Sequence, residues 1–343
     1  MEERIMSKKI LMVVLSLVMV MTLVVGCGSN TPAPTTAAPT TQAGGGETTP
    51  EATTSLAYPE DNIEVVYHSK AGSGGDIFLR TMGKALEPAL GVSWVVNNMP
   101  GASGATAFEY AASAEPDGYT LLGVSSTIIT APLISGMTTT YKDFEPVCMM
   151  FTDPMVVFVQ EESPFQTLAD LIEFGKANPG TLKIAGGTPG ELGFVVGAEL
   201  MRVAGFEMAL VPFEGGGDAA VSVLGGHVDG GIGEYAEIAS SVEAGKLRII
   251  ASLNAMPEAP EIPTFASEGY PEIQIEKFRG VLAPKGTPQE VIDKLAEMMK
   301  TAFDDPDFQQ YIKANNMIPN YKVGAEFTAI MDAQHEQVKS TLE

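Results

Sequence analysis

Short apolar runs alternate along the chain with stretches whose apolar residues recur at helical spacing, and glycine- or serine-rich turns separate them. The apolar runs predict buried strands, and the helical spacing predicts helices that cover the sheet. The predicted strands are Ile63–Tyr67, Ser93–Val96, Thr120–Val124, Pro154–Gln160, Leu182–Ala185, Ala209–Pro212 and Leu247–Ser252. The predicted helices are Ile77–Leu86, Ala105–Ser113, Leu168–Lys176, Leu192–Ala204, Ala219–Gly225, Ala236–Ala244 and Pro288–Phe303. This alternation predicts an α/β fold with mixed, mostly parallel sheets flanked by helices.

The N-terminus predicts the compartment. Two lysines precede an apolar run at Ile10–Val25, which is short for a membrane span and typical of a signal peptide. The run ends in "LVVGC", which resembles a bacterial lipoprotein box. That resemblance implies a signal peptide over residues 1–26, cleavage before Cys27 and a diacylglyceryl thioether on its sulfur. The alternative is an ordinary signal peptide followed by an incidental cysteine.

Residues 27–57 consist almost entirely of Thr, Ala, Pro, Gly and Ser, so we expect a disordered tether. Cys148 lies in the apolar stretch "PVCMMF", which predicts that its thiol is buried in the core. A lipidated Cys27 cannot pair with it, so no intramolecular disulfide is expected. An anchor followed by a tether predicts an extracytoplasmic domain held beside the cell membrane, and the remaining chain is long enough for two lobes.

The chain has 20 Lys and Arg against 43 Asp and Glu, a formal net charge of −23. Nucleic-acid binding requires clustered basic residues, so this balance excludes it. Three histidines, at 68, 227 and 335, lack metal-ligand spacing, and we expect neither a metal nor a cofactor. Asp76 and Asp218 follow glycine turns near helix starts, where carboxylates cap helices more often than they catalyse.

Five turns share one chemistry: "SKAGSGGD", "MPGASGAT", "VSSTIIT", "GGTPGELG" and "EGGGDAA". Each offers backbone N–H groups, hydroxyls or a following helix N-terminus, which are suited to carboxylate or phosphate oxygens. The first turn fails the dinucleotide pattern because Ile77 stands where a third glycine would fall, and no phosphate-loop motif occurs at these turns. We therefore expect a small anion rather than a nucleotide.

An ordered series of motifs carries a family resemblance: "VVYHSKAGSGGDIFLR", "NNMPGASGATA", "AEPDGYTLL", "YKDFEPV", "VPFEGGGDAAVSVLGGHVDGGI" and "FRGVLAPKGTPQEVIDKL". The stretch Pro116–Leu122 is the most specific of them. Taken in order over nearly all of Ile63–Glu343, the series resembles the substrate-binding proteins of tripartite tricarboxylate transporters, the Bug family. We expect a lipoprotein form of such a protein.

The resemblance implies a two-lobed clamshell of the type II periplasmic-binding class. Lobe 1 would comprise residues 58–156 and 281–343, lobe 2 residues 157–280, and strands near Pro154–Gln160 and Ile275–Leu282 would form the hinge. It also implies a monomer that captures a mono-, di- or tricarboxylate and delivers it to a two-subunit membrane permease. The candidate ligand-binding residues are Ser69, Lys70, Gly72, Ser73, Gly74, Asp76, Gly101, Ala102, Ser103, Gly104, Ser125, Ser126, Thr127, Gly187, Thr188, Gly215, Gly216, Gly217 and Glu234.

The chain departs from the family pattern at two places. His68–Ala71 stand where the family has a Pro-Phe-rich stretch, so Lys70 adds a cation that either pairs with an extra carboxylate or is solvated. Glu234 and Tyr235 replace residues such as Asp-Asn, and a buried Glu234 would favour a cationic or donor group. Two alternatives stay open: a lipid-anchored ligand sensor, and a hydrolase or isomerase using Asp76, His68 and Glu234. We expect no enzymatic activity.

Overall fold

The computed structural model of the protein describes residues 57–213 and 215–342. The predicted signal peptide, Cys27 and the tether through residue 56 lie outside the described residues. Within the described ranges no helix is both long enough and apolar enough to cross a membrane.

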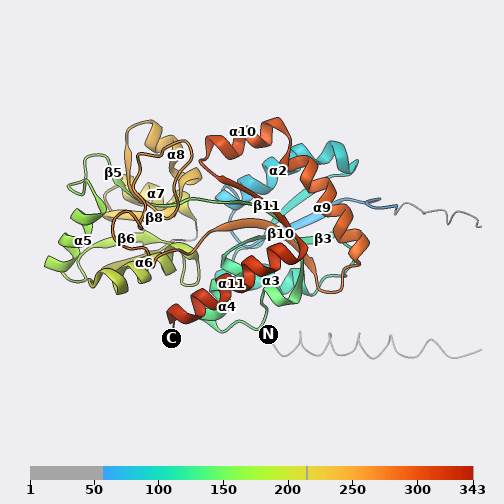
Figure 1. The fold of residues 1–343 in the computed structure, drawn as a ribbon, viewed down its shortest axis with the longest axis horizontal. Helices are drawn as coiled ribbons and strands as arrows, with labels where there is room; N and C mark the ends of the chain where they lie inside the picture. Colours follow the sequence, from blue (N-terminus) through green and yellow to red (C-terminus); the bar gives the residue numbers. More distant parts are fainter. Residues whose placement is uncertain (1–56, 214, 343) are drawn as a thin grey trace, which may run out of the picture. The chain divides into compact units, whose positions relative to one another are not determined.

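The first of two sheets has six strands in the order β11-β4-β10-β3-β1-β2. Their bounds are β1 Ile63–Tyr67, β2 Trp94–Asn98, β3 Thr120–Ser125, β4 Phe144–Thr152, β10 Phe278–Pro284 and β11 Ile318–Val323. Side chains alternate across the sheet: Val65 of β1 packs into one core and Val66 into another. Helices α2 (Gly74–Leu90), α9 (Gln289–Phe303) and α10 (Pro306–Ala314) cover the first face. Helices α3 (Ala105–Ala112), α4 (Thr127–Ser135) and α11 (Gly324–Leu342) cover the second (Figure 1).

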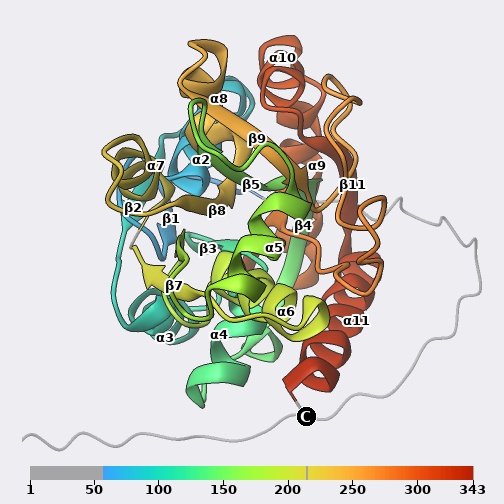
Figure 2. The same ribbon diagram turned by 90° about the vertical axis from the view of Figure 1, so that its left-hand side faces the viewer.

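The second sheet has five strands in the order β7-β6-β8-β5-β9. Their bounds are β5 Met155–Gln160, β6 Lys183–Gly186, β7 Ala209–Pro212, β8 Gly230–Glu234 and β9 Leu247–Ser252. One face packs against α5 (Leu168–Ala177) and α6 (Leu192–Ala204), and the other against α7 (Gly216–Leu224) and α8 (Tyr235–Glu243). Figure 2 shows these helices and strands from the side of the second sheet. Each sheet therefore has a core on each of its faces, and Val338 of α11 also packs into one core of the second sheet.

The mixed α/β fold with helix-flanked sheets is confirmed. Among the described strands, however, four pairings are parallel and five antiparallel, so parallel pairing does not predominate. The antiparallel pairings all involve β4, β5, β10 or β11, the strands nearest the crossovers and the chain's end.

Strands β4, β8 and β11 and helix α4 lay outside the sequence prediction, and the structure shows the physical reason for β8 and α4. Strand β8 reads "GGIGE" and lacks an apolar run, because a Cβ at Gly231 would stand 2.3 Å from the ring of Phe158. Helix α4 reads "TIITAPLIS", which is β-branched and apolar on all sides, so no helical stripe appears. The predicted turn at Val124–Thr130 is thus the end of β3 and the start of α4.

The chain passes between the two sheets at two adjacent places. It leaves the first sheet after β4 through Asp153 and returns just before β10 through Lys277. The Asp153 N–H donates to the Lys277 carbonyl oxygen at 2.7 Å, so the two crossings lie side by side. These crossings fall in the segments expected to form the hinge; hinge motion and the residue bounds of the two lobes stay predictions.

Cys148 is a free, buried thiol on β4, as expected. Its sulfur lies 3.2 Å from that of Met299, and burial raises the pKa of the thiol, which keeps it protonated at neutral pH.

Candidate ligand-binding site

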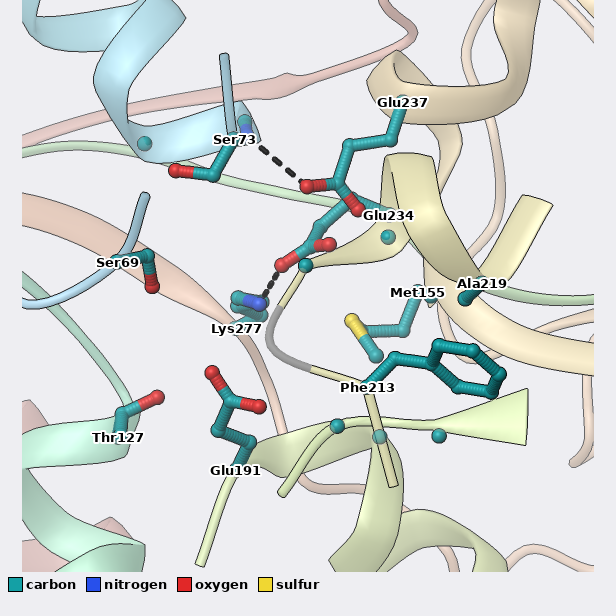
Figure 3. Close-up of a pocket in the computed structure, with 18 of the residues that line it drawn as sticks. Ser69, Ser73, Thr127, Met155, Glu191, Phe213, Ala219, Glu234, Glu237 and Lys277 are labelled. Carbon is teal, nitrogen blue, oxygen red and sulfur yellow. Dashed lines mark hydrogen bonds and ion pairs between the residues drawn. The ribbon is translucent and has the colours of Figure 1, made fainter. Parts of the chain in front are cut away.

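A cleft opens where turns of both sheets meet beside the two crossings (Figure 3). About 510 Å³ between the turns is unfilled by protein atoms, and part of this space is open to solvent. The lining residues are Tyr67, His68, Ser69, Ser73, Gly74, Gly75, Thr127, Met155, Gly186, Gly187, Glu191, Gly193, Phe213, Gly215, Gly216, Ala219, Ile232, Gly233, Glu234, Glu237, Lys277 and Arg279. Most of them follow the carboxyl ends of strands, where open α/β sheets bind ligands.

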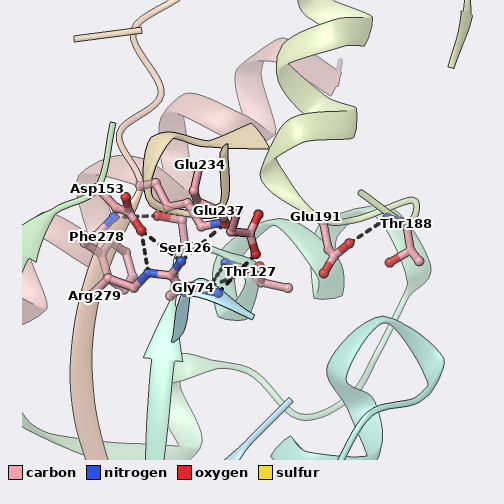
Figure 4. Close-up of polar contacts among 12 residues, drawn as sticks. Gly74, Ser126, Thr127, Asp153, Thr188, Glu191, Glu234, Glu237, Phe278 and Arg279 are labelled. Atoms are coloured by element: carbon pink, nitrogen blue, oxygen red, sulfur yellow. Dashed lines mark hydrogen bonds and ion pairs between the residues drawn. The ribbon is translucent and has the colours of Figure 1, made fainter. Parts of the chain in front are cut away.

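Arg279 lies at the base of the cleft, on β10, with 1% of its surface exposed. Its Nε donates to Asp153 Oδ2 at 2.9 Å, and its Nη1 donates to the hydroxyl of Tyr67 at 2.6 Å. Its Nη2 reaches Glu234 Oε1 at 3.2 Å (Figure 4). The guanidinium thus joins β1, the first crossing and the end of β8, and its planar donors fix their relative positions.

Lys277 is the second buried cation of the cleft. Its ammonium group pairs with Glu234 Oε1, the oxygen that Arg279 also contacts. Burial, followed by the neighbouring Arg279 charge, lowers the pKa of Lys277 to about 7. One of its three N–H donors is directed to Glu234, which leaves the others for a ligand.

Glu237 projects from the first turn of α8 toward the N-termini of α2 and α7. Its Oε1 accepts a hydrogen bond from the Gly74 N–H at 3.0 Å, and its side chain lies against Gly216. Its Oε2 is buried and has no hydrogen-bonding partner of good geometry. Burial raises the pKa of Glu237 to about 7, against the opposing effect of the Gly74 hydrogen bond. Gly74 and Gly216 are the first residues of their helices, so this carboxylate occupies a favourable anion position.

Three further side chains complete the polar wall. Ser73 Oγ and His68 Nδ1 are buried without a hydrogen-bonding partner. Burial, and then the charge of Arg279, lowers the pKa of His68 to about 3, so its imidazole is neutral at physiological pH. Glu191 Oε2 accepts from the Thr188 N–H at 2.6 Å, and Figure 3 shows its carboxylate facing Lys277 and Thr127.

The structure brings many of the sequence-predicted residues together. Those lining the cleft are Ser69, Ser73, Gly74, Thr127, Gly187, Gly215, Gly216 and Glu234. A neighbouring smaller pocket is lined by Ser69, Gly101, Ala102, Ser103, Gly104 and Thr188. Ser103 Oγ donates to the Pro189 carbonyl oxygen at 2.8 Å, so this pocket also joins turns of the two sheets. Ligand contact by any of these residues stays a prediction.

The remaining candidates line neither pocket: Lys70, Gly72, Asp76, Ser125, Ser126 and Gly217. The Asp76 carboxylate accepts from the Gly72 N–H at 2.8 Å and from Arg80 at 2.9 Å, which orders the turn before α2. Ser126 Oγ donates to the Glu276 carbonyl oxygen at 2.7 Å and accepts from the Phe278 N–H. Lys70 lies at the rim, 3.7 Å from Asp218, with about half its side chain exposed.

Besides Glu234, the cleft is lined by four charged residues that were not predicted from the sequence: Glu191, Glu237, Lys277 and Arg279. Lys277 and Arg279 alternate with apolar residues in "IEKFRGVLAP", and basic residues in an otherwise buried strand are a signal for a paired, interior site. Glu237 carries no such signal, because a carboxylate in the first turn of a helix is ordinary capping chemistry.

Residues 78–343 match the family described as "Tripartite tricarboxylate transporter family receptor". The chain belongs to this family. Protein BugT of Bordetella pertussis is 30% identical over 271 residues, which cover 76% of this chain and 82% of that protein. The solved periplasmic binding protein BugD is 27% identical, with a TM-score of 0.77 over 83% of this chain and 97% of that one. MatC of Rhodopseudomonas palustris, solved with bound malate, is 22% identical, with a TM-score of 0.76 over 83% of this chain and all of that one.

The family resemblance and the two-lobed binding-protein fold expected from it are confirmed. Members of this family are extracytoplasmic solute-binding proteins and not enzymes, as expected for this chain. The hydrolase alternative is thereby set aside. Within the described part of the chain no cluster of His, Cys, Asp and Glu has the geometry of a metal site.

Proposed function

We propose that the protein is a lipid-anchored, monomeric receptor that captures a small organic carboxylate in this cleft and delivers it to a two-subunit membrane permease. The observation that carries the proposal is Lys277, a buried ammonium group facing open space between two sheets. A buried cation with unused donors is suited to a carboxylate, and closing the cleft would strengthen that contact by excluding water. The malate bound by MatC supports the same ligand class.

The ligand class is tested by thermal unfolding of the full chain with mono-, di-, tri- and amino-carboxylates. A ligand at about a hundredfold excess over its Kd stabilises the folded state by about 2.7 kcal/mol, which gives a clear rise in Tm. Lys277→Met should abolish the rise, while Lys294→Met, on the exposed face of α9, should retain it. A panel in which no carboxylate raises the Tm of wild type contradicts the proposal.

The anchor is tested separately. Since "LVVGC" precedes the tether, Cys27→Ser should move the protein from the membrane to the soluble fraction without changing its melting temperature. Wild-type protein found entirely in the soluble fraction would refute lipid anchoring. The second candidate function is that of a ligand sensor, which would not deliver its ligand to a permease. Uptake of labelled ligand into cells that is lost when the protein is deleted would support transport over sensing.

A further inference from the structure

We propose that the cleft selects a ligand carrying a protonated nitrogen as well as a carboxylate, and that Glu237 binds the nitrogen. The inference rests on the proposed function, because it concerns the same cleft and the same ligand. It predicts that an amino carboxylate binds more tightly than a dicarboxylate of equal length.

The charges of the cleft are the first support. Three carboxylates line it, those of Glu191, Glu234 and Glu237, against the two cations Lys277 and Arg279. Asp153, fully buried, adds a fourth carboxylate behind Arg279. Both cations already have acidic partners: Lys277 pairs with Glu234, and Arg279 with Asp153 and Glu234. A ligand with two negative charges would enlarge this excess, whereas an ammonium group would offset it.

The remaining two acids are compensated only at longer range, Glu237 by Arg279 and Glu191 by Lys277. Among the described residues, neither Glu191 nor Glu237 forms an ion pair with a lysine or arginine. Both carboxylates are partly exposed and line the cleft, so they can reach a cationic group from outside the chain.

Glu237 also occupies the position that a second ligand carboxylate would need. Its Oε1 takes the N–H of Gly74 at the start of α2, and its side chain covers Gly216 at the start of α7. Both helix N-termini are therefore in contact with a carboxylate that belongs to the protein. Above its pKa of about 7 Glu237 is ionised, so a ligand carboxylate entering here would be repelled and an ammonium group would be attracted.

Unpartnered polar atoms are an independent sign of a ligand on this wall. His68 and Ser73 are 5% and 9% exposed, both line the cleft, and His68 Nδ1 and Ser73 Oγ have no hydrogen-bonding partner. The Glu237 carboxylate has its Oε2 against Gly216, and Figure 3 shows Ser73 and Glu237 as neighbours. A carboxylate oxygen, a hydroxyl and a neutral imidazole nitrogen can all accept hydrogen bonds, and an ammonium group supplies three donors. Glu234 lies between Glu237 and Lys277 in Figure 3, so Lys277 is the group that remains to bind the ligand carboxylate.

The test compares length-matched ligand pairs by calorimetry on the full chain: succinate with β-alanine, glutarate with 4-aminobutanoate, and adipate with 5-aminopentanoate. In each pair one carboxylate is replaced by an ammonium group at the same distance. We expect at least one amino carboxylate to bind about tenfold or more tightly than its partner. Glu237→Gln should remove that preference, and Glu243→Gln, an exposed position on the same helix, should keep it.

A second variant guards against a folding defect in Glu237→Gln. Ser73 makes no side-chain capping bond to α2, so Ser73→Ala should fold normally and still weaken the amino carboxylate alone. Tighter binding of the dicarboxylates to wild type overturns this inference and leaves the proposed function intact. An amino-carboxylate preference that survives in both variants also overturns it. Failure of every ligand to bind overturns the proposed function together with the inference.

Discussion

Replacing Arg279 with methionine tests whether the ionic base of the cleft holds the two crossings together. The side chain is 1% exposed, and its guanidinium contacts Asp153, Tyr67 and Glu234 at 2.9, 2.6 and 3.2 Å. Methionine fills much of the volume but leaves the fully buried Asp153 carboxylate without its cation. Removing one partner of a buried ion pair costs about 3–5 kcal/mol of unfolding free energy, and we expect a loss in that range.

A double-mutant cycle separates this electrostatic loss from lost packing. Asp153→Asn removes the stranded charge, so the double variant Asp153→Asn/Arg279→Met should recover about 1–3 kcal/mol relative to the sum of the single losses. Lys294→Met is the matched control, because Lys294 pairs with Glu297 at 3.0 Å on an exposed helix face. Exposed pairs contribute about 0–1 kcal/mol, so this variant should be close to wild type.

Urea unfolding followed by fluorescence provides the readout, since Trp94 is the only tryptophan of the chain and is 6% exposed. Circular dichroism on the same samples shows whether the transition is a single cooperative event, which the free energies require. The reasoning is refuted if Arg279→Met loses less than about 1 kcal/mol. Strict additivity in the cycle would refute the electrostatic cause.

Three further changes follow from the same geometry. Gly75→Ala places a Cβ 2.0 Å from the ring of Tyr67, so Tyr67 must leave Arg279, and we expect a loss of about 1–3 kcal/mol by urea unfolding. His68 has a pKa of about 3 in the folded chain against 6.5 for an ordinary histidine. Between these two pH values the unfolded chain therefore binds a proton that the folded chain does not. The contribution of His68 to the free energy of unfolding is complete above pH 6.5 and falls by about 1.4 kcal/mol per pH unit as the pH decreases toward 3. We expect this slope to be absent in His68→Gln. Lys70→Met should weaken ligand binding by less than about fivefold, and the difference should vanish at high salt, because Lys70 is half exposed and pairs with Asp218.

Each change has a control and a contrary result. Gly217→Ala adds a Cβ with no atom within 4 Å and should be neutral; equal losses at Gly75 and Gly217 would refute the steric argument. His227→Gln, at an exposed position, should keep the wild-type pH slope. For Lys70→Met, a loss above about tenfold that persists at high salt would show that the lysine enters the closed cleft.

The fold was predictable where one pattern dominated. Strands Ile63–Tyr67, Ala209–Pro212 and Leu247–Ser252 and helix Leu192–Ala204 have the predicted bounds. Most of their apolar residues are buried in the cores, except in Ala209–Pro212, where they are partly buried. Strand β8 was not predictable, because its glycines accommodate the Phe158 ring, a contact made only in the folded sheet. The even mixture of parallel and antiparallel pairing likewise depends on the crossings, which no local pattern reveals.

The site was predictable as a set of turns and not as a set of charges. Glycines at 74, 187 and 216 line the cleft, because turns after parallel strands meet at one edge of a sheet. The ions at its base depend on pairing between distant segments: Arg279 meets Tyr67 across 212 positions of the sequence. Lys70 stood out in the sequence as an unusual cation, yet the structure places it at the rim and Lys277 inside.

Native mass spectrometry of the full chain, purified without denaturation, tests the central claim most directly. If the cleft holds an organic carboxylate on Lys277, the wild-type protein carries a bound small molecule whose mass after release is that of a carboxylic acid. The Lys277→Met variant, folded and purified in the same way, carries none. A wild-type ligand without a carboxyl group, or the same acid retained equally by Lys277→Met, would contradict the account.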